Sequence, residues 1–209
     1  MAYETRETEE AVKMVLLALA ALILGVLWGA YGPDGTLIDL IASHSDWVLY
    51  LLMLLVGISV GLNRDIGKKI KEYHIKIFII PFGVVTGSVL GGWAAAFLLG
   101  MPLNQGAAIA SGMGWYSLSG VMITEMYGAT VGSISFLCNL MREIFSFFSI
   151  PWISRHLNYY TCIAPAGATS EDTTLSMMVR YTNEETVVMS VFNGIICSAL
   201  VPILTRLVG

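Results

Sequence analysis

The stretch SFLCNLMREIFSFFSIPW, residues 135–152, sets an arginine and a glutamate side by side in the middle of an apolar run. A helix over residues 129–153 would place Arg142 and Glu143 near its centre. An unshielded charge at the centre of a bilayer costs about 3 kcal/mol, so neither side chain can face lipid. The stretch therefore predicts a membrane helix with one side turned toward the protein interior.

The composition is that of an integral membrane protein. Of the 209 residues, 56% are hydrophobic and only 12% are charged, which leaves too little polar surface for a soluble domain of this size. Apolar runs over residues 12–31, 47–62 and 75–100 approach or exceed the roughly 20 residues that cross a hydrocarbon layer about 30 Å thick. We expect an all-α integral membrane protein surrounded by the lipid bilayer, with no nucleic-acid partner.

Charges outside the apolar runs predict the topology. An acidic N-terminal tail, residues 1–11, precedes a single membrane domain, residues 12–209, and lacks the basic start of a signal peptide, so the first run is expected to remain as a helix. The loop over residues 63–76 holds five of the eleven basic residues, whereas residues 32–46 hold none. Because Lys and Arg favour cytoplasmic loops, the loop and the N-terminus are predicted to be cytoplasmic.

Two stretches are too polar and too rich in small residues for ordinary membrane helices. LNQGAAIASGMGWYSLSGVMITEMYG, residues 103–128, is crowded with Gly and Ser, and CIAPAGATSEDTTLS, residues 162–176, lies between the apolar runs 129–153 and 185–207. Irregular backbone at membrane depth needs protein or water around it. We therefore expect a helix bundle of five to seven spans with broken or re-entrant helices, and the side on which the last loops fall stays open.

Small residues recur every four positions, an arrangement that lets helix backbones approach closely. The glycines concerned are Gly25 and Gly29, Gly57 and Gly61, Gly83, Gly87 and Gly91, and Gly128 and Gly132. We interpret them as packing positions in a compact bundle. The three cysteines lack metal or redox spacing and the three histidines are scattered, so we expect free thiols, no metal site and no cofactor.

Helical spacing gathers the polar residues of the run 129–153 on one face. That face holds Ser135, Asn139, Arg142, Ser146 and Ser149, with Gly132 below it and Glu143 on its flank. Adjacent helical residues do not face each other, so Arg142 and Glu143 should each have a partner elsewhere. Candidate partners are Glu125, Glu171 and Asp172.

Two interpretations of the charged face stay open. The first is structural: an interhelical salt bridge that only holds the bundle, with Glu125 solvated at a helix end. Glu171 and Asp172 would then belong to a helix N-terminal turn capped by Thr169 or Ser170. The second, which we favour, is a cavity or transport path, because ionisable groups at this depth usually serve a function.

The broken helices indicate the kind of ligand that such a cavity would take. Free N–H groups at a broken helix end suit a carboxylate, and acidic side chains suit ammonium groups. An acid that is desolvated while protonated can release its proton when a cation approaches. The pattern therefore favours a zwitterionic, cationic solute that is exchanged for a proton.

Four motifs, in their order and spacing, resemble the LysO-type lysine exporter family of prokaryotic inner membranes. They are ASGxGWYSLSG at 110–120, TExxG at 124–128, NxxRE at 139–143 and GATSxDxTL at 167–175, and the resemblance runs over about residues 47–207. It implies a multi-pass protein of the inner (plasma) membrane that exports L-lysine and toxic lysine analogues. It also implies ion-coupled antiport, with a proton or sodium as the coupling ion.

The resemblance also implies which residues bind the substrate or ion. Carried onto the matching positions, it points to Glu143 first, then to Asp172 and Glu125, with Arg142 as a charge partner. Further candidates in the same motifs are Asn139, Ser117, Ser119, Thr169 and Ser170. Family members carry an additional N-terminal membrane portion, so we expect a homodimer or a complex with a separately encoded small membrane subunit.

Three other functions compete with lysine export. A channel or a transporter for another small solute fits the same polar cavity, and so does a structural subunit of a split transporter. An intramembrane enzyme would use a serine of GWYSLSG as its nucleophile, but a serine needs a base within reach and no histidine lies in a predicted span. We therefore expect a transporter and not an enzyme.

Overall fold

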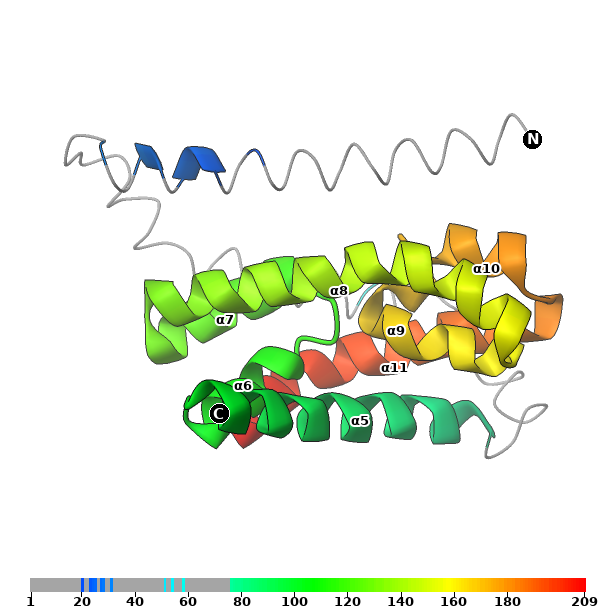
Figure 1. The fold of residues 1–209 in the computed structure, drawn as a ribbon, viewed down its shortest axis with the longest axis horizontal. Coiled ribbons are helices and arrows are strands. Elements are labelled where there is room, and N and C mark those ends of the chain that lie inside the picture. Colours follow the sequence, from blue (N-terminus) through cyan, green and yellow to red (C-terminus); the bar gives the residue numbers. More distant parts are fainter. Residues whose placement is uncertain are drawn as a thin grey trace. The chain divides into compact units, whose positions relative to one another are not determined.

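The computed structural model describes residues 76–209 continuously, together with isolated helical positions between residues 20 and 58 (Figure 1). The chain divides into two units, residues 1–50 and 51–209, and the fold below is that of the second. The predicted spans over residues 12–31 and 47–62, the acidic tail and the basic loop lie outside the described residues. Their topology therefore stays a prediction.

The described part is helical throughout and contains no strand. Its elements are α5 (Lys76–Leu99), α6 (Leu103–Ala110), α7 (Tyr116–Tyr127), α8 (Ala129–His156), η1 (Tyr159–Cys162), α9 (Ile163–Ala166), η2 (Gly167–Glu171), α10 (Leu175–Tyr181) and α11 (Glu184–Val208). Three of them, α5 from Phe78, α8 and α11, are long and apolar enough to cross a membrane. This confirms the all-α membrane fold. The three helices coincide with the apolar runs 75–100, 129–153 and 185–207, and the total of five to seven spans stays a prediction.

Both stretches predicted to be irregular are broken helices. Residues 111–115 separate α6 from α7, and in this first break Met113 and Gly114 have left-handed φ values of 48° and 97°. The second break contains η2 and separates α9 from α10, with Gly167 at φ 61°. Glycine adopts such backbone without strain, so the Gly-rich composition and the interruption of the helices have the same physical cause.

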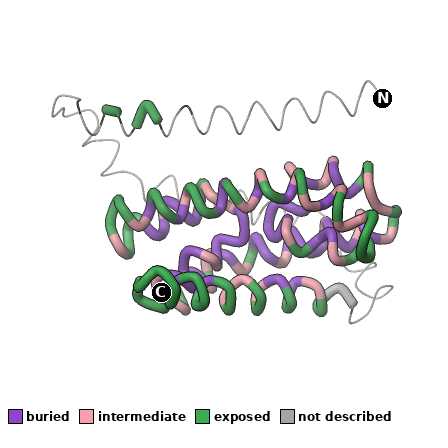
Figure 2. Tube along the Cα trace, in the orientation of Figure 1, coloured by how far each residue is buried: buried purple, intermediate pink, exposed green. Residues whose placement is uncertain are grey.

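The long helices enclose the broken ones. Figure 1 shows α7 beside the first half of α8, with α5 on the opposite side of this unit and α6, α9 and α11 between α5 and α8. Buried residues gather on the inner sides of these helices, whereas the outer sides of α5 and α8 are exposed (Figure 2). Phe97, Phe145 and Phe148 are among the exposed apolar side chains, as expected for surfaces that face lipid.

The close helix contacts use different glycines from those predicted on α5. A Cβ atom added at Gly92 would overlap the carbonyl oxygen of Gly106, so α5 and α6 touch through their backbones. At Gly83, Gly87 and Gly91, an added Cβ atom would meet no described atom. The packing role predicted for these three glycines is therefore not seen within residues 76–209. The buried stripe of α5 runs instead through Val84, Gly92 and Ala96, and the contacts follow it.

We predict that Gly92→Ala destabilises the protein and that Gly87→Ala does not. The methyl group at position 92 would force α5 and α6 apart, at a cost of about 1–3 kcal/mol, whereas the same group at position 87 enters open space. Thermal unfolding of the two purified variants in one detergent would measure the difference. Equal midpoints for the two variants would contradict the backbone contact between α5 and α6.

Candidate functional site

The two breaks meet in the interior of the bundle. The backbone N–H of Ala168, in the second break, donates to the carbonyl of Met113, in the first, over 2.9 Å. A Cβ atom added at Gly114 would lie 3.4 Å from the Ala166 carbonyl oxygen, and one added at Gly167 would lie 3.0 Å from the Arg142 guanidinium. A Cβ atom at Gly167 would also overlap the Met113 carbonyl oxygen, so glycine there allows the two interrupted helices to cross beside the middle of α8. Gly114 is required by its left-handed backbone and not by lack of space.

The inward face of α8 is polar, as the sequence predicted. Its buried residues are Gly132, Ser135, Asn139, Leu140, Glu143, Ser146 and Ile150. Glu143 lies on the centre of this face, whereas Arg142 is half-buried at its edge, so the predicted places of these two residues are exchanged. The reason is that the buried positions follow steps of three and four residues from Gly132 through Asn139 to Glu143.

Asn139 holds the first break against α8. Its side-chain oxygen accepts from the N–H of Gly114 at 2.8 Å. Its Nδ2 group donates to the carbonyl of Ile109 at 2.9 Å and lies 3.2 Å from the hydroxyl of Ser119. One buried amide therefore satisfies backbone groups on both sides of the interruption. This is a framework role for two residues that the sequence placed among the ligand-binding candidates.

Asn193 of α11 holds the second break in a similar way. Its Nδ2 group donates to the Gly167 carbonyl and to the Ser170 hydroxyl, each at 2.9 Å. The hydroxyls of Ser170 and Ser190 each donate to the other residue's carbonyl, at 2.8 and 2.6 Å. Thr169 donates to the Ala166 carbonyl at 2.9 Å. Thr169 and Ser170 are thus buried in the framework of the break.

The contribution of α11 to the site was not predicted from the sequence. Seven of its buried residues are small or polar, and the central five recur at helical spacing: Ser190, Asn193, Gly194, Cys197 and Ser198. The signal was present, because polar residues at steps of three and four in an apolar span indicate a face turned away from lipid. Only the fold shows that this face of α11 packs against the second break.

Arg142 binds backbone carbonyls instead of the predicted acids. Its guanidinium donates from Nε to the Pro165 carbonyl at 3.1 Å and from Nη2 to the Ala164 carbonyl at 3.1 Å. Its Nη1 donates to the Ser88 hydroxyl at 2.8 Å. None of its hydrogen bonds within the described ranges goes to Glu125, Glu171 or Asp172. The side chain leaves α8 toward α5 and α9, where the unpaired carbonyls at the end of α9 attract a cation.

Glu143 has an unsatisfied carboxyl in the interior. The residue is 1% exposed, and its Oε2 has no hydrogen-bond partner in the part of the chain that the structure describes. The Thr173 side chain lies near this carboxyl, although its hydroxyl donates to Oδ1 of Asp172 at 3.3 Å, and Asp172 is close enough to act on Glu143 electrostatically. Both acids also act on Tyr116, the first residue of α7. The fold therefore brings together Glu143 and Asp172, which lie 29 positions apart in the sequence.

Other predicted residues lie elsewhere. Glu125 is exposed nine positions beyond Tyr116 on α7, which is about 13 Å along the helix axis, so the fold does not bring it to Glu143. Ser117 is exposed in the first turn of α7. Among the described residues, no group of three or more His, Cys, Asp or Glu side chains could hold a metal ion.

Glu171 and Asp172 face different neighbours although they are adjacent. Asp172 lies near Glu143, whereas the Oε1 atom of Glu171 accepts a hydrogen bond of 2.9 Å from Ser198 on α11. Glu171 belongs to the segment between the spanning helices α8 and α11. Burial raises the pKa of Glu171 to about 7, and the Ser198 hydrogen bond opposes this shift. Burial thus favours the protonated form of this acid.

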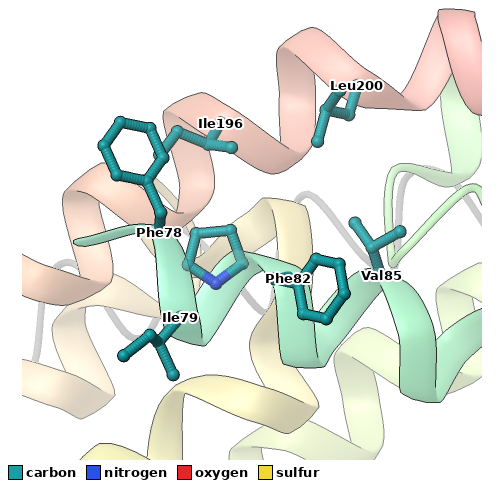
Figure 3. Close-up of a pocket in the computed structure, with 7 residues that line it drawn as sticks. Phe78, Ile79, Phe82, Val85, Ile196 and Leu200 are labelled. Carbon is teal, nitrogen blue, oxygen red and sulfur yellow. The ribbon is translucent and has the colours of Figure 1, made fainter. Parts of the chain in front are cut away.

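Two hollows in this part of the chain lie away from Glu143. One, of about 290 Å³, lies between α5, α6 and α8 and is lined by residues that include Gly87, Gly91, Asn139 and Arg142. The other, of about 420 Å³, is an apolar groove between α5 and α11 that contains no ionisable side chain (Figure 3). The chemistry of the groove suits lipid chains and not a charged solute.

Comparisons with known proteins agree with the motifs. The family model described as "Lysine exporter LysO" matches residues 19–208. The lysine exporter LysO of Escherichia coli is 39% identical over 162 residues, which cover 77% of this chain and 53% of that protein. A Haemophilus influenzae protein, whose name assigns lysine export provisionally, is 34% identical over 194 residues, or 93% of its length. The chain thus spans about half the length of the first relative, and no solved structure matches it.

We predict that Asn139→Ala loosens the first break. The change leaves the Gly114 N–H and the Ile109 carbonyl without their partner, which should cost about 1–3 kcal/mol of stability. Ser133→Ala, on the exposed side of the same helix, is the control. Thermal unfolding and proteolysis of residues 111–115 in detergent would check this. An Asn139→Ala protein as resistant as the control would argue against the framework role.

Proposed function

The chain belongs to the lysine exporter LysO family, and we propose that it exports L-lysine and lysine analogues across a bacterial inner membrane. The family is one of transporters, and the described fold is an all-α membrane bundle. The observation that best supports a cationic substrate is the buried carboxyl of Glu143, whose Oε2 has no partner among the described residues. A carboxyl in such a place needs either a proton or a cation.

The two acids support an exchange of lysine for a proton. Asp172 is exposed, Glu143 is buried, and both Asp172 and the following residue, Thr173, lie near the Glu143 carboxyl. An ammonium group that enters from the side of Asp172 would reach Glu143 last. As the ammonium group binds, the Glu143 proton is released, because a neighbouring cation favours the charged form of an acid. Return of a proton would then release lysine, which is antiport.

The start of α7 supports recognition of the lysine carboxylate. Helix α7 begins at Tyr116, within electrostatic reach of both acids, and its N-cap residue, Trp115, makes no side-chain hydrogen bond to the helix end. A helix N-terminus offers backbone N–H groups and a partial positive charge to an anion. Donors for a carboxylate and acids for an ammonium group thus lie close together, as a zwitterionic amino acid requires.

The remaining polar residues support this site without binding the substrate. Arg142, Asn139 and Ser119 are occupied by backbone and side-chain partners around the first break and α9, and Thr169 and Ser170 by partners around the second. Their hydrogen bonds keep the backbone irregular at a depth where water is scarce. We propose that these five residues fix the geometry in which Glu143 and Asp172 act.

A second membrane subunit is part of the proposal. The hollow between α5 and α8 is lined by the exposed glycines Gly87 and Gly91, which would let a further helix approach closely. Either a second copy of this chain or a separately encoded small subunit would supply it. We also propose a cytoplasmic N-terminus, on the ground of the basic loop over residues 63–76.

We predict that Glu143→Gln and Asp172→Asn each reduce lysine export at least about tenfold, while the protein still inserts. An amide keeps the size of the side chain but cannot exchange a proton or balance an ammonium group, and a tenfold loss corresponds to about 1.4 kcal/mol. Glu184→Gln, at the exposed start of α11, is the control and should export normally. Counterflow of labelled lysine in proteoliposomes, at matched protein content, measures the effect.

The same assay separates the competing functions. The assay is repeated with arginine, ornithine or an acidic amino acid as the counter-substrate. The comparison shows which of these solutes drives lysine movement. Normal export by the Glu143→Gln variant would refute the proposed role of this acid. Absence of lysine flux in the assembled complex, with flux of another solute, would refute lysine export itself.

A further inference from the structure

Glu171 occupies a place on α11 that the proposed transport site does not use. Its Oε1 atom accepts a 2.9 Å hydrogen bond from the Ser198 hydroxyl, and its side chain crosses α11 at Gly194. A Cβ atom added at Gly194 would lie 2.6 Å from the backbone nitrogen of Glu171 and 2.8 Å from its Cγ atom. The stem of the acid can approach α11 only because residue 194 has no side chain.

Glu171 lies against the middle of α11. Gly194 is near the middle of α11, which runs from Glu184 to Val208 and is apolar enough to span a bilayer. The segment that carries Glu171 is fixed there by the hydrogen bonds among Ser170, Ser190 and Asn193. The carboxyl is therefore held in a fixed place beside α11, with one oxygen bound by Ser198 and part of the residue's surface accessible.

The charges around Glu171 leave its carboxyl without a cationic partner in the described ranges. Asp172, on the same segment, contributes a negative charge, and the titratable neighbour on α11 is the thiol of Cys197. From α8, Arg142 acts on Cys197 but donates its hydrogen bonds to carbonyls and to Ser88. Glu143, also on α8, lies near Thr173 and Asp172. Among the described groups that act on Glu171, the Ser198 hydroxyl favours the charged form, whereas burial and the charge of Asp172 favour the protonated form.

We propose that Glu171, seated on Gly194 and held by Ser198, is a second proton-binding site, separate from the pair Glu143 and Asp172. The two adjacent acids at the break would then have different partners. Asp172 acts together with the buried acid of α8, Glu143, whereas Glu171 lies against the polar face of α11. This inference rests on the proposed transport only for the function of the bound proton. Binding of the proton is a property of the chain that can be measured without lysine.

Labelling with dicyclohexylcarbodiimide tests the site, because the reagent modifies protonated carboxyls in apolar surroundings. The purified full chain would be labelled over a pH series and the modified peptide identified by mass spectrometry. We expect label on Glu171 at about pH 6, its loss by about pH 8 and a midpoint near neutrality, since one pH unit changes the ratio of the two forms tenfold. Glu171→Gln should abolish the label at this position while retaining an acceptor for Ser198.

Two further variants separate a proton site from a carboxyl that is merely reactive. Ser198→Ala removes the donor that favours the charged form and should raise the labelling midpoint by about half a unit to one unit. Ser133→Ala, on the exposed side of α8, should leave the midpoint unchanged.

Three results would overturn the inference. The first is that Glu171 is not labelled at any pH, and the second is that its labelling does not change with pH. The third is that sodium protects Glu171 from labelling at constant pH, which would assign the site to a metal cation. Lysine counterflow with the same preparation tests the proposed export separately. Failure of that assay alongside a normal labelling profile would reject lysine export but retain the proton site.

Discussion

The polar backbone of two interrupted helices must be satisfied at a depth where the bilayer offers no hydrogen bonds, and the rest of this structure depends on that constraint. Each interruption frees N–H and carbonyl groups that a continuous helix would pair internally. The fold places the two breaks against each other, joined by the hydrogen bond from Ala168 to Met113. It then supplies one buried asparagine to each break, Asn139 from α8 and Asn193 from α11.

The same constraint explains why the arginine and glutamate on α8 differ in role. Arg142 donates to three acceptors at once. Two of them are the carbonyls of Ala164 and Pro165 near the end of α9, which accept from no other described side chain. The charge of Arg142 is thus stabilised by these acceptors within the fold. Glu143 can only accept while it is charged, and its Oε2 atom has no donor in the described part. The bundle therefore uses its cation as a structural element and leaves an acid available for exchange.

The sequence predicted the elements well because their signals are local. Apolar runs of sufficient length gave α5, α8 and α11, and the excess of Gly and Ser gave both breaks, since each depends on residues close together in the chain. The polar side of α8 was also predicted, because helical periodicity fixes which residues share a face. Prediction was poorer for contacts between elements: the spacing of Gly83, Gly87 and Gly91 suggested packing, but the close approach of α5 and α6 is made at Gly92.

The sequence by itself determined that this chain enters a membrane, where its helices are interrupted, and that α8 turns a polar side inward, because hydropathy and helical periodicity are properties of neighbouring residues. Only the tertiary structure decided that Arg142 binds carbonyls, that Glu143 lies beside Asp172, and that Glu171 turns to Ser198. These pairings join residues that are distant in sequence. Which acid meets which partner depends on how the two breaks cross, and that crossing follows from packing at glycine contacts that no local pattern specifies.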